Sequence, residues 1–178
     1  MKNIQIKEIM TPIQEYLTIR EDQTLFDVFQ LLESHSNITH RDIIVVGAFG
    51  DFIGKITMMD IFKALEPNYK KLFKSYDDGV LTKRYVLGAL KDYHLWREPI
   101  KDICQRGSML KVSEFMHVPG EYEYVQEEDS IEKALHEYVM GAHQPLIVKK
   151  EDDITGILRF EDLYEVIHKH MLACPVPS

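Results

Sequence analysis

The sequence has little cysteine and no long apolar run at its start. Its two cysteines, Cys104 and Cys174, lie far apart among 178 residues and match no zinc-binding or redox spacing. The N-terminal stretch lacks the apolar length of a signal peptide or a membrane span. These absences predict a protein of the reducing cytoplasm with no membrane partner.

Basic residues are in deficit. The chain carries 29 acidic and 21 basic residues, which gives a formal net charge of −8. A broadly acidic surface repels phosphate backbones and anionic headgroups, so we do not expect nucleic acid as a partner. A small basic pocket for an anionic ligand is compatible with this charge. Apolar residues make up 45% of the chain, which is typical of a globular protein with a core.

Signatures of catalysis are absent as well. The sequence contains no Gly-rich phosphate loop of the Walker type, no metal-ligand set and no nucleophile with a placed base. Carboxylates are plentiful, but their spacing pairs none of them. We therefore do not expect an enzyme, and no motif requires a metal or a cofactor.

What the chain does contain is a strand, a tight turn and a helix start at residues 54–65. Ile53 and Ile56 are suited to a buried strand, and Thr57 and Asp60 have the spacing of a capping box. In a capping box the Thr side chain accepts from the amide three residues on, and the acidic side chain accepts from the cap amide. Apolar residues follow at helical spacing, at Ile61, Phe62 and Leu65.

A second copy of this stretch appears at residues 156–164. The equivalent positions are Thr24 and Ser130, Gly54 and Gly156, and Asp60 and Asp162, which are separated by 106, 102 and 102 residues. An internal repeat of this kind indicates two similar units in one chain. Because neither unit would cover its sheet alone, we expect the units to bury apolar surface against each other.

We predict an α+β fold of two units, each built from a short helix, a strand, a helix, two strands and a helix. The first unit spans residues 1–66 and the second spans 110–178 with a short frayed tail, while a helical insert spans 67–109. The insert is too apolar for a flexible linker, and its last helix is predicted from Pro99 to Gly107. We expect the insert to pack on the two units or to make an oligomer contact.

Two copies of an apolar-Met opener, a capped helix, two short strands and a Gly-x-x-Thr-x-x-Asp motif resemble a tandem pair of CBS domains, a Bateman module. The openers are Ile9-Met10 and Phe115-Met116, and the resemblance covers about residues 4–66 and 110–171. It implies a pseudo-twofold pair that often forms homodimers and is usually not an enzyme. It also implies an adenosine-containing ligand of the AMP, ADP, ATP or S-adenosylmethionine class, bound in clefts between the two domains.

The resemblance assigns the ligand contacts to particular residues. Asp60 would bond the ribose hydroxyls, since a carboxylate accepts from two vicinal hydroxyls, and Thr57 would lie near the phosphates at a helix N-terminus. Further contacts are expected from His40, Arg41, Asp42 and Ile43 on the base or phosphate side, and from Met10, Thr11 and Pro12 beside the adenine. Lys55 would add positive charge, unless strand alternation turns it away.

The second copy departs from the motif. Arg159 stands where Thr or Ser is expected, although Asp162 is kept. Arg159 would either donate to a phosphate or pair with Glu161 or a neighbouring carboxylate and fill the cleft. We therefore expect one better site, around Thr57 and Asp60, and one altered site near Arg159 and Asp162.

Two interpretations of function follow. In the first, the chain is a stand-alone regulatory module whose adenosine ligand biases its conformation or oligomeric state and thereby signals to a partner protein. In the second, it is a ligand-free dimerisation or partner-docking scaffold built on degenerate CBS domains. The second is compatible with a purely structural role for Thr57 and Asp60, because Thr24 and Asp27 have the same cap spacing and no expected ligand.

Overall fold

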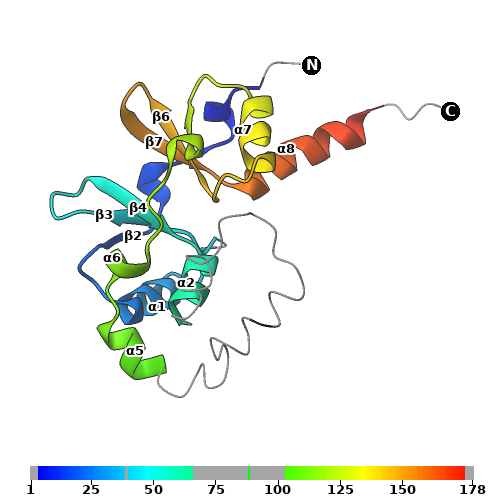
Figure 1. Cartoon of the computed structure of the whole chain (residues 1–178). Helices are drawn as coiled ribbons and strands as arrows, with labels where there is room; N and C mark the ends of the chain where they lie inside the picture. Colours follow the sequence, from blue (N-terminus) through cyan, green and yellow to red (C-terminus); the bar gives the residue numbers. More distant parts are fainter. Residues whose placement is uncertain (1–3, 39, 66–87, 89–102, 175–178) are drawn as a thin grey trace. The chain divides into compact units, whose positions relative to one another are not determined.

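The computed structural model describes residues 4–38, 40–65, 88 and 103–174, and these form a mixed α+β fold, as predicted (Figure 1). The chain divides into two compact units. Unit 1 comprises Met1–Leu17 and Val118–Ser178, and unit 2 comprises Thr18–His117. Each unit therefore combines most of one sequence repeat with the opening segment of the other repeat.

Unit 2 contains a three-stranded sheet in the order β2-β3-β4. Its elements are β2 (Thr18–Arg20), α1 (Leu25–Ser34), β3 (Ile43–Val46), β4 (Phe52–Ile56), α2 (Met58–Leu65), α5 (Ile103–Met109) and α6 (Val112–Phe115). Strand β2 runs parallel to β3, and β3 pairs antiparallel with β4. The β-branched side chains of β3 suit a buried pleated strand, and its first three residues are at most 1% exposed.

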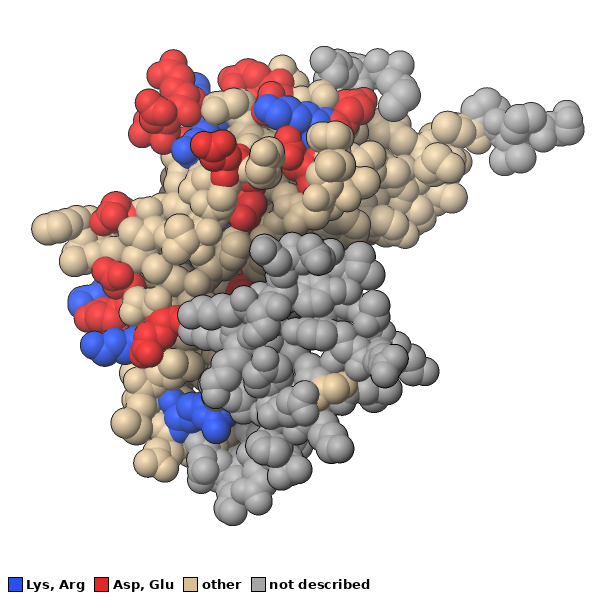
Figure 2. Space-filling view, viewed as in Figure 1, with Lys and Arg blue, Asp and Glu red and all other residues tan. Residues whose placement is uncertain are grey.

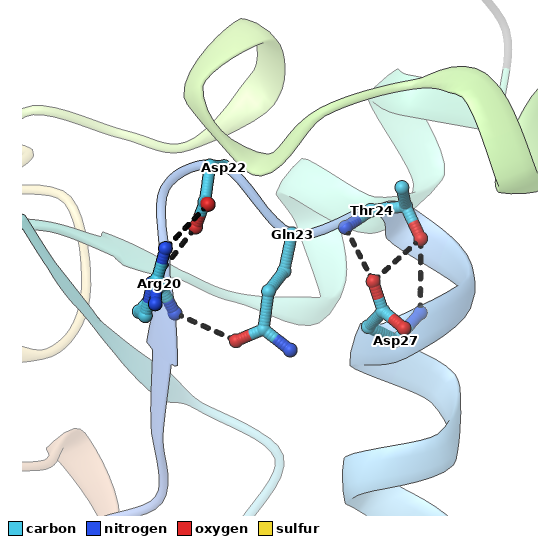
Figure 3. A network of polar contacts seen from close by, with 5 residues as sticks. All are labelled: Arg20, Asp22, Gln23, Thr24 and Asp27. Atoms are coloured by element: carbon cyan, nitrogen blue, oxygen red, sulfur yellow. Dashed lines mark hydrogen bonds and ion pairs between the residues drawn. The ribbon is translucent and has the colours of Figure 1, made fainter. Parts of the chain in front are cut away.

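The turn from β2 into α1 is held by local polar contacts (Figure 3). The amide and the hydroxyl of Thr24 donate to Asp27 Oδ2 at 2.7 and 2.8 Å, and the Asp27 amide donates back to Thr24 Oγ1 at 3.3 Å. Arg20 forms a two-bonded ion pair with Asp22, in which Nε donates to Oδ1 at 2.9 Å and Nη2 to Oδ2 at 2.5 Å. The capping box predicted at Thr24 and Asp27 is therefore confirmed.

Unit 1 repeats this topology with an added edge strand. Its elements are η1 (Ile6–Glu8), β1 (Thr11–Pro12), η2 (Ile13–Glu15), η3 (Glu121–Glu123), β5 (Tyr124–Gln126), α7 (Ile131–Val139), β6 (Leu146–Lys150), β7 (Asp153–Leu158) and α8 (Phe160–Ala173). The sheet has the order β1-β7-β6-β5, with β5 parallel to β6 and β6 antiparallel to β7. Because β5, β6 and β7 pair as β2, β3 and β4 do, the predicted duplication is present in the fold.

The core of unit 1 joins its sheet to its helices. Ile6, Val125, Ala134, Leu146 and Leu158 belong to one cluster of buried apolar residues and are each at most 1% exposed. Ile6 comes from the opening segment of the chain, and its backbone amide donates to the Asp129 carbonyl at 2.9 Å. The opening segment is thus part of the core of unit 1.

The reciprocal segment, at residues 110–117, belongs to unit 2. The Leu25 amide donates to the Leu110 carbonyl at 2.9 Å, and the Val112 amide donates to the Gln23 carbonyl at 2.8 Å. Val112 is fully buried. The opening segment of each sequence repeat therefore belongs to the structural unit that contains most of the other repeat.

The predicted helical insert lies mostly outside the described residues, which include only Gly88 and 103–109 of it. One detail is wrong. Gly107 was predicted to end a helix, but it lies inside α5, which continues to Met109 and places Gly107 in a buried position. A glycine in a helix interior costs about 1 kcal/mol relative to alanine, which lowers the stability of a helix without ending it.

Charge on the face drawn in Figure 2 is mixed, with acidic side chains more frequent than basic ones. This agrees with the formal net charge of −8. Among the described helices, none combines the length and the apolar character needed to cross a membrane.

Candidate functional site

Three of the residues predicted to contact a ligand, Lys55, Thr57 and Asp60, lie at the junction of β4 and α2. Thr57 lies between the two elements, and its amide and hydroxyl donate to Asp60 Oδ2 at 2.9 and 2.7 Å. Thr57 is 8% exposed and Asp60 is 5% exposed. The capping box predicted here is confirmed, and it holds a carboxylate inside unit 2 at the start of a helix.

Lys55 adds a third buried polar side chain to this junction. It is fully buried at the end of β4. Among the described residues, four polar or charged side chains are classed as buried, and three of them are Lys55, Thr57 and Asp60. We call these three residues the polar junction. Because Lys55 is buried, its side chain does not face solvent, and its contact with a ligand stays a prediction.

The cap of α1 shows what a capping box alone requires. Thr24 and Asp27 make the same set of hydrogen bonds as Thr57 and Asp60, with nearly the same lengths. The difference is environment, because Thr24 and Asp27 are only half-buried and have no buried lysine beside them in sequence. Burying a charged carboxylate and a lysine is costly unless they are hydrogen-bonded or paired. The polar junction therefore exceeds what is needed to start a helix.

The segment at Met116-His117 lies against β4 in unit 2. The Lys55 amide donates to the His117 carbonyl at 2.9 Å, and the His117 amide donates to the Lys55 carbonyl at 2.8 Å. A Cβ on Gly54 would come 2.9 Å from the His117 carbonyl oxygen and 3.2 Å from Met116 Sδ. Glycine at position 54 thus permits the opener of the second repeat to reach the strand that leads into the polar junction.

Unit 1 has the mirror arrangement. Thr11 and Pro12 pair with Ile157 and Gly156 at the edge of β7. A Cβ on Gly156 would lie 2.6 Å from Met10 Sδ. The structure therefore places Thr11 in the unit that carries Arg159 and Asp162, whereas the sequence analysis grouped Thr11 with Thr57 and Asp60. Sequence offsets identify equivalent openers but contain no information on which strand each opener joins.

Arg159 lies at the start of α8 and pairs with Asp162. Its Nε donates to Asp162 Oδ2 at 2.8 Å, and its Nη2 donates to Oδ1 at 2.5 Å. The two side chains are 20% and 18% exposed. This ion pair raises the pKa of Arg159 further above its ordinary value, chiefly through the hydrogen bonds to Asp162. Of the partners considered from sequence, the structure selects this neighbouring carboxylate and not Glu161.

The other predicted contacts lie at the start of β3. Ile43 is fully buried and pairs with Ile56 of β4, so its side chain belongs to the core. His40 and Arg41 are half-buried just before this strand. Arg41 lines a hollow of about 250 Å³ together with Phe29, Met58 and Phe62 of α1 and α2. The residues lining this hollow do not include Thr57 or Asp60.

One contact of the candidate site was missed from sequence, namely the backbone pairing of His117 with Lys55. The offset between the openers marks Met116 as the counterpart of Met10, and this was the available signal. The pairing itself depends on which sheet edge is open, and this is decided by the fold of the whole unit.

Residues 6–67 match a family model described as CBS domain. Comparison with curated protein sequences gave no match. The first repeat is therefore a CBS domain, as the resemblance predicted.

Solved structures of CBS-domain proteins share the fold of the whole chain. CBSX2 in complex with AMP has 15% identity and a TM-score of 0.57, over 94% of this chain and 98% of that chain; CBSX2 is an Arabidopsis thaliana protein. The CBS domain of a bacterial CNNM/CorC family Mg²⁺ transporter in complex with ATP has 22% identity and a TM-score of 0.58, over 92% and 87%. A CBS domain-containing protein from Bacillus anthracis has 18% identity and a TM-score of 0.59, over 93% and 94%. The chain has the fold of a tandem CBS-domain protein.

Proposed function

We propose that the chain is a regulatory module that binds an adenosine-containing ligand at the polar junction of unit 2 and signals through its conformation or oligomeric state. The observation that carries the proposal is the burial of Lys55, Thr57 and Asp60 together at the β4–α2 junction. Structures with the same fold were solved with AMP and with ATP. These structures support the proposal of an adenosine nucleotide, and the proposed ligand class is AMP, ADP, ATP or S-adenosylmethionine.

The chemistry of the polar junction suits such a ligand. A carboxylate such as that of Asp60 accepts hydrogen bonds on both oxygens, which suits two vicinal ribose hydroxyls. The N-terminus of α2 presents backbone amides and a partial positive charge, which favour a phosphate or a carboxylate. Lys55 and Arg41 supply positive charge on the same unit. No step of this function requires a catalytic group, a metal or a cofactor.

Thermal unfolding with AMP, ADP, ATP and S-adenosylmethionine tests the proposal. A compound present at a hundred times its dissociation constant stabilises the folded state by about 2.7 kcal/mol and raises the melting temperature accordingly. The Asp60→Ala variant should lose this shift. Asp27→Ala is the matched control, because it removes the same capping carboxylate from α1. It should lower the melting temperature without ligand and keep the ligand-induced shift.

The proposal is rejected if none of the four compounds raises the melting temperature, or if Asp60→Ala and Asp27→Ala respond to the compounds alike. The second outcome would show that Asp60 acts only as a helix cap.

A ligand-free scaffold is the second candidate, and the Arg159–Asp162 pair favours it, because it occupies the motif carboxylate of one repeat. Exposed apolar residues on α1 and α2 would then serve homodimerisation; Phe29, Met58 and Phe62 are 45%, 48% and 48% exposed. Light scattering decides between the candidates. If the chain is a scaffold, wild type should be a dimer with or without AMP and ATP, and the Phe62→Ser variant should have a lower average mass. If it is a sensor, AMP or ATP should change the measured mass.

A further inference from the structure

The helices α2 and α8 begin at equivalent positions of the two repeats and differ in the residue before the first helical residue. In unit 2 this residue is Thr57, whose amide and hydroxyl both donate to Asp60 Oδ2. In unit 1 it is Arg159, whose guanidinium donates to both oxygens of Asp162. The cap of α2 thus engages Oδ2 of Asp60, whereas a cation engages both oxygens of the equivalent carboxylate, Asp162, in unit 1.

The backbone cap bond is kept in unit 1 but is longer than in unit 2. The Arg159 amide reaches Asp162 Oδ2 at 3.4 Å, against 2.9 Å for the Thr57 amide and Asp60. A bidentate guanidinium–carboxylate pair is charge-assisted at both bonds and is roughly twice as strong, bond for bond, as a pair of neutral groups. Both oxygens of Asp162 are therefore occupied by charge-assisted hydrogen bonds from Arg159.

The pair is sheltered from solvent. Its side chains are 20% and 18% exposed, whereas those of the other two-bonded pair, Arg20 and Asp22, are 61% and 56% exposed. Sheltered ion pairs are screened less by water and salt than exposed ones. Hydrogen bonds to Asp162 raise the pKa of Arg159 above its ordinary value, and an arginine side chain is charged in proteins in any case.

We propose that Arg159 is an internal occupant of the ribose position in unit 1, which closes this position to adenosine ligands and leaves each chain with one ligand site, in unit 2. The inference rests on the proposed function, because it takes Asp162 as the counterpart of a ligand-binding Asp60. It makes Arg159 the residue that determines how many ligands a chain binds.

The alternative role, in which Arg159 donates to a ligand phosphate, does not open the ribose position. Two of the five N–H donors of Arg159 bind the two oxygens of Asp162, and the other donors can reach an anion while this pair stays intact. Ribose hydroxyls would have to replace the charged donors at Asp162, which would give a weaker set of bonds. A contact of Arg159 with an anion therefore leaves the ribose position closed.

Replacing Arg159 by threonine should open the closed position. Threonine is a favourable N-cap residue and recreates the Thr-x-x-Asp spacing of unit 2, so α8 keeps a cap in the Arg159→Thr variant. Equilibrium dialysis with radiolabelled AMP, ATP and S-adenosylmethionine should give one bound molecule per wild-type chain and two per Arg159→Thr chain. The Asp60→Ala/Arg159→Thr double variant should bind one.

Arg20→Thr is the matched control. It also removes an arginine that forms a bidentate pair with an aspartate, Asp22 (Figure 3). This pair lies in an exposed turn, and Asp22 does not cap a helix. It should bind as many molecules as the wild type. Circular dichroism and thermal unfolding of each variant establish that it is folded.

The outcomes separate the two claims. Two molecules bound by the wild type, or no additional molecule bound by folded Arg159→Thr, overturns the role of Arg159. A wild type that binds none while Arg159→Thr binds one supports the role of Arg159 and rejects the proposed site at Asp60. One molecule bound by the wild type and two by the variant, with Arg20→Thr unchanged, supports both.

Discussion

The hydroxyl of Tyr138 on α7 donates a 2.5 Å hydrogen bond to the carbonyl of Leu158, the last residue of β7. It also accepts one of 3.2 Å from the amide of Leu146, the first residue of β6. Tyr138 is 9% exposed, and its ring meets Phe160 edge-on at 5.3 Å. One side chain therefore holds together the strand end that precedes Arg159 and the strand paired with it.

The first prediction concerns this hydroxyl. Tyr138→Phe leaves a buried carbonyl and a buried amide without this partner while keeping the ring, so the free energy of unfolding should fall by about 1–3 kcal/mol. Urea denaturation measures the change. Tyr164→Phe is the control, because Tyr164 is 56% exposed and its substitution should change stability by less than about 0.5 kcal/mol. Equal losses in the two variants would contradict a structural role for the Tyr138 hydroxyl.

The second prediction concerns Gly156 of β7, which contacts the segment at residues 10–12. In Gly156→Ala the new Cβ would lie 2.6 Å from Met10 Sδ and 2.9 Å from the Thr11 carbonyl oxygen, so β1 must move away from β7. Overpacking of this kind costs about 1–3 kcal/mol of stability, measurable as a lower denaturation midpoint.

Gly107→Ala provides the comparison for this substitution. A Cβ there meets no atom of the described residues within 4 Å, and the residue is helical, so alanine should be neutral or stabilise the protein by up to about 1 kcal/mol. A Gly156→Ala variant as stable as Gly107→Ala would show that β1 is not closely packed on β7.

The third prediction concerns pH. Burial raises the pKa of Tyr124 above its ordinary value of 10.0, and the negative charge of Glu123 raises it further. The unfolded chain therefore releases this proton at lower pH than the folded protein does. The contribution of Tyr124 to stability is fully present below about pH 10 and is lost as pH rises through the folded-state pKa.

Melting temperatures recorded across this alkaline range should decrease less steeply for Tyr124→Phe than for the wild type, since phenylalanine has no proton to lose. Identical pH profiles would show that Tyr124 titrates alike in the folded and unfolded states. Tyrosinate absorbance in the near ultraviolet provides an independent measure of the same titration.

Local features of this fold could be predicted from the sequence because they depend on residues close together in the chain. The capping boxes at Thr24 and Thr57 need only a hydroxyl and a carboxylate three residues apart, and the buried strand at β3 needs only consecutive β-branched residues. The duplication was visible because its positions recur at nearly constant offsets.

Long-range features could not be predicted in this way. The pairing of Thr11 with Ile157 and of Lys55 with His117 depends on which sheet edges are left open once each unit is packed. The pairing of Arg159 with Asp162 depends on side-chain geometry, because Glu161 carries the same charge one residue away. The proposed number of ligand sites rests on that geometry and not on the motif alone.

Exchange of the openers has a consequence for how the protein can be divided. A gene split between the repeats, or a protease cut after residue 66, would leave β1 on one fragment and its partner β7 on the other. The same cut would separate α1 from residues 110–112, whose backbone holds its first turn. Neither fragment would contain all the segments of one structural unit. The two fragments would therefore have to associate before either unit could form.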